Sequence, residues 1–179
     1  MNHDRYDDAY IRGILNSVKN VAIVGASPAE HRPSHFVVKY LAQRGYRIFP
    51  INPGHGGKPI ANIPAYAKLA DVPEPQDMVD VFRNSEHLPG ILDEVLALPH
   101  RPKVFWMQLG VRNDEVAARA EAAGMQVVMN RCPKIEYGRL SGEIGWIGVN
   151  TRTLSAKKPQ RMSGGVQRLT LGTEDKAGG

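Results

Sequence analysis

The sequence has 179 residues, of which 42% are hydrophobic and 23% charged, and its formal net charge is +5. This length and composition suit one globular α/β domain with a tail, and they exclude two large domains or a wholly disordered chain. No apolar run approaches the roughly 20 residues that span a bilayer, and the first residues lack the apolar segment of a signal peptide, so we expect a cytoplasmic protein without a membrane partner.

Apolar side chains recur in two patterns along the chain. Helical spacing indicates amphipathic helices, whereas short continuous apolar runs indicate strands buried on both faces of a parallel sheet. Ser34 and Ser85 stand where helix caps are expected, and Gly45 stands where a helix ends. Residues 52–59 are a loop by composition, and residues 60–75 predict no regular element. In chain order the patterns predict a helix over 8–19, a strand over 21–24, a helix over 34–44, strands over 46–51 and 78–82, a helix capped by Ser85, a strand over 103–109, a helix over 113–123 and a strand over 125–130. In the helix that Ser85 caps, Pro89 either lies in the first turn or begins the helix.

The end of the chain has a weaker pattern. Residues 132–150 predict at most one short helix that closes the domain. Residues 151–179 carry six basic and two acidic side chains and are nearly free of aromatic ones, which predicts a disordered basic tail. Because most of the net charge lies in this tail, we expect no specific nucleic-acid partner.

Strands that alternate with helices predict an α/β fold of the Rossmann-like type, with a doubly wound, mostly parallel sheet in a single domain. The expected organisation is an N-terminal helix within residues 1–20, the Rossmann-like domain at 21–150 and a flexible tail at 151–179. In such a sheet the ligand lies at the carboxyl ends of the strands, near the point where the strand order reverses. The segments expected there are 25–27, 52–53, 82–85, 108–111 and 130–133.

The turn after the first strand has the features of an anion site. Gly25 permits close approach of the backbone, Ser27 adds a hydroxyl, and the helix that follows points its free amides and positive end toward the crevice. Arg32 and Lys58 supply positive charge for a phosphate. The second strand ends in Asn52 rather than in the carboxylate that binds the ribose of NAD, so the crevice favours a ribose that carries a phosphate.

Several other kinds of site do not fit the sequence. The G-x-G-x-x-G spacing is incomplete, and Lys58 is followed by proline, so neither an NAD fingerprint nor a Walker A loop is predicted. Ser27 lacks the G-x-S-x-G elbow of a hydrolase and is expected to donate a hydrogen bond to a phosphate. His31 and His35 have Pro33 between them at the start of a helix, so no metal site is predicted. No catalytic residue is assigned.

Five segments resemble the small stand-alone bacterial proteins of the CoA-binding domain family: VAIVGAS with RPS, VVKYLAQRGYRIFPINP, DMVDVFRNSE, VFWMQLGV and MNRCPKIE. In larger proteins this domain forms the N-terminal part of the succinyl-CoA synthetase α subunit. The resemblance covers about residues 8–140 and implies a Rossmann-type fold that binds coenzyme A. The synthetases' second domain and phosphohistidine loop have no counterpart in the sequence, so their ligase chemistry is not expected.

The resemblance also implies which residues meet the cofactor. In the family the first turn meets the phosphates, the segment after the second strand lies against the ADP part, and the turns after the later strands line and close the cleft. Carried over to this sequence, the CoA-binding residues are Gly25, Ala26, Ser27, Arg32, Ser34, Asn52, Pro53, Lys58, Phe82, Arg83, Asn84, Gln108, Gly110, Val111, Asn130 and Cys132.

Cys132 is the single cysteine and the one residue with reactivity of its own. We expect Arg131 beside it to lower its pKa, and we hypothesise a mixed disulfide with the CoA thiol. The expected function is non-catalytic binding of coenzyme A or acyl-CoA, a small-molecule nucleotide ligand. The alternatives are an NADP-dependent oxidoreductase and an interaction protein that keeps a vestigial cleft, and the sequence leaves a weak homo-oligomer open.

Overall fold

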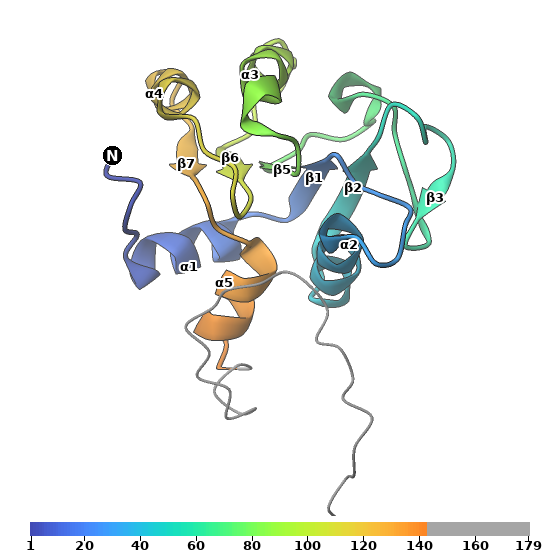
Figure 1. Ribbon diagram of the computed structural model, residues 1–179, viewed down its shortest axis with the longest axis horizontal. Coiled ribbons are helices and arrows are strands. Elements are labelled where there is room, and N and C mark those ends of the chain that lie inside the picture. The colour runs from blue at the N-terminus through green and yellow to red at the C-terminus, as the bar shows by residue number, and fades with distance from the viewer. Residues whose placement is uncertain (143–179) are drawn as a thin grey trace, which may run out of the picture.

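A computed structural model describes residues 1–142, and its centre is a five-stranded parallel sheet (Figure 1). The strands are β1 (Asn20–Val24), β2 (Arg47–Ile51), β5 (Met78–Val81), β6 (Val104–Met107) and β7 (Gln126–Val128). They lie in the order β2-β1-β5-β6-β7. The chain passes from β2 to the other side of β1 to form β5, so the strand order reverses between β1 and β5. This reversal is the switch point of a doubly wound sheet.

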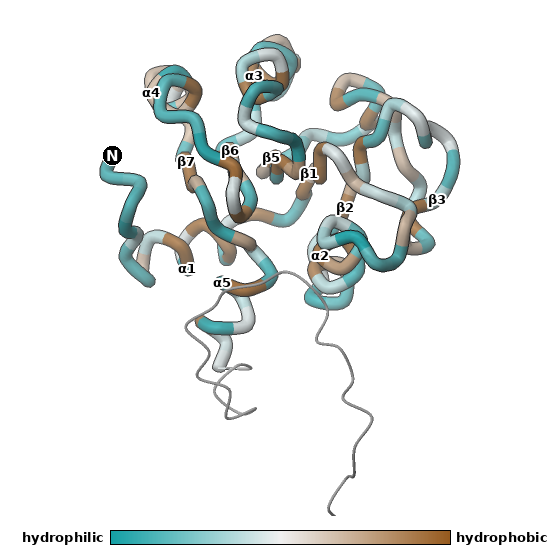
Figure 2. Tube along the Cα trace, viewed as in Figure 1, coloured by the Kyte–Doolittle hydropathy of each residue, from teal (hydrophilic) through white to brown (hydrophobic). Residues whose placement is uncertain are grey.

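Helices cover both faces of the sheet, as Figure 1 shows. The helices are α1 (Asp8–Ser17), α2 (Pro33–Gln43), α3 (Leu88–Leu96), α4 (Asp114–Ala122) and α5 (Pro133–Leu140). α1, α2 and α5 pack on one face, and α3 and α4 pack on the other. Within β1, Val21 and Ile23 join the first core and Ala22 joins the second, as expected of a strand buried on both faces. Figure 2 shows hydrophobic residues of β1 and β5 between the two helix layers.

The predicted fold class and main elements are confirmed, but the absence of regular structure expected over residues 60–75 is wrong. This part of the chain contains β3 (Pro59–Ile60) and β4 (Ile63–Pro64), which form a short antiparallel hairpin, and the 3-10 helix η1 (Leu69–Asp71). The Tyr66 amide donates to the Pro50 carbonyl, and the Tyr66 carbonyl accepts from the Asn52 amide, both at 2.9 Å. The segment is therefore ordered by contacts with β2 rather than by a local sequence pattern.

Ser34 is not the cap that the sequence predicts for α2. The helix begins one residue earlier, at Pro33, with Arg32 as the residue before it. Proline suits this position because its fixed φ matches a helix and its missing amide is not needed there. The Ser34 side chain is buried within the first turn, and its hydroxyl accepts a hydrogen bond from the Ser27 amide at 3.0 Å.

Ser85 is likewise not the cap of α3. It begins a 3-10 helix, η2 (Ser85–His87), and α3 follows directly at Leu88. The Ser85 hydroxyl accepts a hydrogen bond from the Arg112 amide at 3.1 Å. The serine thus links the turn after β5 to the turn after β6.

Two tyrosines from the N-terminal segment cover the outer edge of β7. The Tyr6 hydroxyl accepts a hydrogen bond from the Met129 amide at 2.7 Å, and the Tyr10 hydroxyl donates to the Val127 carbonyl at 3.2 Å. The two rings are stacked with centroids 5.9 Å apart. Backbone groups at this edge therefore have side-chain partners.

The expected end of the domain at 143–150 and the tail at 151–179 lie outside the described residues. None of the helices within residues 1–142 is long and apolar enough to cross a membrane.

Candidate functional site

A cleft of about 950 Å³ opens at the carboxyl ends of β1, β2 and β5, beside the switch point. This volume lies in the range of small-molecule and cofactor sites. Its walls are the β1–α2 turn, the segment after β2, the residues before η1, the turn after β5 and one face of α3. The cleft is therefore where a doubly wound sheet binds its ligands.

The structure brings nine of the sixteen predicted CoA-binding residues together around this cleft. They are Gly25, Ala26, Ser27, Arg32, Ser34, Asn52, Pro53, Phe82 and Arg83. The other seven do not line it: Lys58, Asn84, Gln108, Gly110, Val111, Asn130 and Cys132. The first group comes from β1, β2 and β5, whose ends meet at the switch point, whereas most of the second group follows β6 and β7.

The amides of the first turn have hydrogen-bond partners within the protein. The Gly25 and Ala26 amides donate to the Ile51 carbonyl at 3.0 and 3.2 Å. The Ser27 amide donates to the Ser34 hydroxyl at 3.0 Å. The turn therefore shapes the wall of the cleft, and the charge that attracts a ligand has to come from other groups.

Two contacts explain the residue types in this wall. Gly25 has a φ of 84°, and a Cβ there would lie 2.9 Å from Cδ of Arg83 and 3.1 Å from the Phe82 carbonyl oxygen. A side chain would be strained by the backbone and would collide with the turn after β5. Asn52 donates from Nδ2 to the Ala26 carbonyl at 2.7 Å, which ties the end of β2 to the first turn.

Four basic side chains line the cleft: Arg32 at the start of α2, Lys68 before η1, Arg83 after β5 and His87 at the start of α3. Arg32, Lys68 and Arg83 are exposed, and none of the three forms an ion pair within residues 1–142. The start of α2 adds the positive end of a helix dipole. Among the lining residues Glu94, on α3, is the only carboxylate. The cleft thus suits a ligand with several negative charges.

The sequence reasoning missed Lys68 and the face of α3. Lys68 lies in the segment for which no regular structure was expected, so its position opposite α3 had no signal in the sequence. His87, Gly90, Ile91 and Glu94 all line the cleft. Their spacing of three, four and seven residues places them on one side of a helix, and this signal was present beside the apolar stripe that was used to predict the helix.

The turns after β6 and β7 contact each other instead of the cleft. Asn130 accepts a hydrogen bond on Oδ1 from the Gly110 amide at 2.8 Å, and its own amide donates to the Val111 carbonyl at 3.2 Å. Gln108 is buried and donates from Nε2 to both carboxylate oxygens of Asp80, at 3.0 and 2.9 Å. The predicted residues in the turns after β6 and β7 therefore connect parts of the fold outside the cleft.

The prediction of a reactive Cys132 thiolate is wrong. Cys132 precedes α5 and is 1% exposed. Burial, with a contribution from nearby Asp80, raises the pKa of its thiol to about 11. Arg131, which was expected to lower this pKa, lies over the ring of Tyr6 and 3.7 Å from Glu136. The buried, protonated thiol gives no support to a mixed disulfide with the CoA thiol.

Within residues 1–142 there is no group of three or more His, Cys, Asp or Glu side chains that is arranged to hold a metal ion.

The parallel sheet with helices on both faces and a cationic cleft at its switch point define a Rossmann-like α/β protein. Residues 19–138 match the CoA binding domain family, and the chain belongs to this family. An uncharacterized protein of Bacillus subtilis, YneT, is 36% identical over 129 residues, which are 72% of this chain and 93% of that protein.

Solved structures show the same fold. A Thermus thermophilus protein, cell-free ID.343, is 40% identical, with a TM-score of 0.71 over 75% of this chain and 99% of that one. A dinucleotide-forming acetyl-coenzyme A synthetase from Ca. Korarchaeum cryptofilum is 22% identical, with a TM-score of 0.51 over 63% of this chain and 26% of the synthetase. The likeness to the synthetase concerns the fold alone.

Proposed function

We propose that the protein binds coenzyme A or an acyl-CoA in the cleft at the switch point and catalyses no reaction on it. The observation that carries the proposal is the convergence of Arg32, Lys68 and Arg83, all without an acidic partner in the described chain, on one cleft in a member of the CoA binding domain family. Coenzyme A has a diphosphate and a phosphate on its ribose, so it matches cations that are spread along a cleft.

The end of β2 supports a phosphorylated ribose over the ribose of NAD. The residue after β2 is Asn52, whose two side-chain polar atoms contact the Ala26 carbonyl and the Gly54 amide. A carboxylate at this point would bind the ribose hydroxyls of NAD and repel a phosphate. Because no carboxylate directly follows β2, this strand places no negative charge where Lys68 and the neighbouring cations would attract a phosphate.

Ser27 lacks the partners of a nucleophile, which supports binding without catalysis. Its hydroxyl accepts a hydrogen bond from the Ala29 amide at 3.2 Å. The imidazole of His35 contacts the Ser27 carbonyl through Nδ1 at 3.3 Å rather than the hydroxyl. A base that takes a proton from serine has to contact the hydroxyl itself.

Titration calorimetry with coenzyme A, 3'-dephospho-CoA and NADP tests the proposal. We expect coenzyme A to bind and to bind more weakly when the 3'-phosphate is removed. Tighter binding of NADP than of coenzyme A would replace the proposal with an oxidoreductase. Absence of binding by all three would leave an interaction protein with a vestigial cleft.

Substitution of Arg83 tests the electrostatic part of the proposal. Arg83→Gln keeps the part of the side chain that lies against Gly25 and removes the charge. Loss of one charge-assisted hydrogen bond should weaken binding of coenzyme A by about 1.5 to 3 kcal/mol. Arg5→Gln, at an exposed arginine outside the cleft, is the matched control. Equal affinities for the two variants would remove Arg83 from the site.

A further inference from the structure

Helix α3 presents a bare backbone to the cleft at Gly90. Gly90 is exposed and lies on the same side of the helix as His87, Ile91 and Glu94. Its φ is not in the left-handed region, and a Cβ built on it meets no atom within 4 Å. Neither backbone conformation nor packing within the protein therefore requires glycine there. Because glycine stabilises a helix less than alanine does, the missing side chain needs another explanation.

Part of the lining of the cleft is apolar. α3 and η1 lie side by side on the same face of the sheet (Figure 1), and their buried residues belong to one core. Pro53 and Ala67 line the cleft from the β2 side, and Ile91 lines it from α3. The cleft therefore has apolar lining both from the β2 side and from α3, and the missing side chain at Gly90 leaves open space beside the helix. We call the space between Gly90 and these lining residues the slot, and apolar lining of this kind suits a planar ring.

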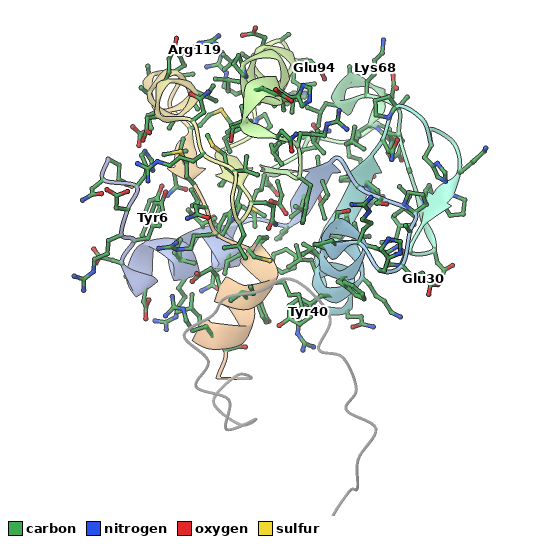
Figure 3. The ribbon with its side chains drawn as sticks, in the orientation of Figure 1. Tyr6, Glu30, Tyr40, Lys68, Glu94 and Arg119 are labelled. Carbon is green, nitrogen blue, oxygen red and sulfur yellow. The ribbon has the colours of Figure 1, made fainter. Side chains whose placement is uncertain are left out.

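Glu94 lines the cleft four residues after Gly90 on α3 and has no ion pair in the described residues. Figure 3 labels it on α3, on the same face of the sheet as Lys68. A carboxylate repels phosphates, so the ligand's phosphates belong nearer to Arg32 and Arg83. The group that a carboxylate binds is a hydrogen-bond donor, such as an amino group.

We infer that the slot between Gly90 and the Pro53–Ala67 wall holds the purine ring of the ligand and that Glu94 accepts a hydrogen bond from its exocyclic amino group. Gly90 and Glu94 are then specificity-determining residues, Gly90 for the width of the slot and Glu94 for an aminopurine over an oxopurine. Hypoxanthine, which has an oxygen acceptor in place of the exocyclic amino group, would place that acceptor against the carboxylate. This inference rests on the proposed function.

Gly90→Leu tests the slot. We expect coenzyme A to bind roughly tenfold more weakly or worse, because the new side chain fills the slot. The melting temperature of the free protein should not fall, since leucine is the better helix former. Gly13→Leu is the matched control: Gly13 is also an exposed helical glycine with no atom near a Cβ, but it lies in α1 outside the cleft.

Glu94→Gln tests whether Glu94 recognises the exocyclic amino group of the purine. Wild type should prefer coenzyme A by roughly tenfold or more over the analogue in which hypoxanthine replaces adenine. The variant should lose most of this preference, because a glutamine amide both donates and accepts. Wild-type affinity in Gly90→Leu, or an unchanged preference in Glu94→Gln, would overturn the inference and leave the proposed function intact. If wild type itself fails to bind coenzyme A, the proposed function falls instead.

Discussion

Asp80 is a carboxyl group with no access to water. It lies in β5, is 0% exposed and receives hydrogen bonds from Nε2 of Gln108. Burial raises the pKa of Asp80 to about 8, although the hydrogen bond from Gln108 opposes this shift. Oε1 of Gln108 is buried without a hydrogen-bond partner in the described chain.

The pKa of Asp80 predicts how stability depends on pH. The unfolded chain loses this proton near pH 4, whereas the folded protein holds it until about pH 8. The folded state therefore binds more protons between these values, and the contribution of Asp80 to the free energy of unfolding should decrease as pH rises from about 4 to about 8. The variant Asp80→Asn is neutral at every pH, so its stability relative to wild type should increase over this window.

Denaturant titrations of both proteins at pH 5 and pH 8 measure this difference. Asp7→Asn, at an exposed aspartate, serves as the control and should follow wild type at both values. If Asp80→Asn also follows wild type at both pH values, Asp80 is ionised in the folded protein and the prediction is wrong.

At the scale of elements, the N-terminal segment is held to β7 through two hydroxyls. In Tyr6→Phe the Met129 amide loses its acceptor, and in Tyr10→Phe the Val127 carbonyl loses its donor. A half-buried backbone group left without a partner should lower the free energy of unfolding by about 1 to 3 kcal/mol in each variant.

Denaturant unfolding checks this prediction, with Tyr66→Phe as the control. Tyr66 is half-buried, and its hydroxyl has no hydrogen bond in the described part of the chain. If Tyr66→Phe lowers the free energy of unfolding as much as Tyr6→Phe does, the hydrogen bonds to β7 contribute no more to stability than a tyrosine hydroxyl without a hydrogen bond.

The sequence predicted long elements better than short ones because long elements repeat their pattern. α1 and α3 each have several apolar side chains on one face, and both helices contain the apolar residues that predicted them, although α3 begins at Leu88 rather than after Ser85. β3 and β4 have two residues each, which is too short for any period to be detected. Their order depends on contacts with β2, and contacts between distant segments are not visible in a single sequence.

The residues predicted for the candidate site also fall into two groups, those that line the cleft and those that do not. The turns after β1, β2 and β5 were predicted because the rule that ligands bind at the carboxyl ends of strands applies directly to them. The rule also selected the turns after β6 and β7, where Gly110 and Asn130 contact each other and not the cleft. Separating the two groups requires the position of the switch point, which depends on the strand order, and the sequence does not state that order.

At the scale of the whole molecule, the cleft joins segments from residue 24 to residue 94. A ligand that bridges them should stabilise the folded state against global unfolding. Coenzyme A at about 100 times its dissociation constant should add about 2.7 kcal/mol, which raises the melting temperature by roughly 5 to 15 °C.

Thermal melts with coenzyme A at low and high salt measure this effect. Binding through Arg32, Lys68 and Arg83 predicts a smaller increase at high salt, because salt screens exposed charges. An increase that does not depend on salt would indicate that apolar contacts, rather than these three side chains, provide the binding energy.

The tyrosines at β7 also limit how copies of this chain associate. A neighbouring molecule that added a strand to this side of the sheet would first have to displace both phenol groups from the backbone. Self-association that leaves the N-terminal segment in place must therefore use a surface other than the β7 edge, and any dimer built on a continuous sheet across β7 requires that segment to detach.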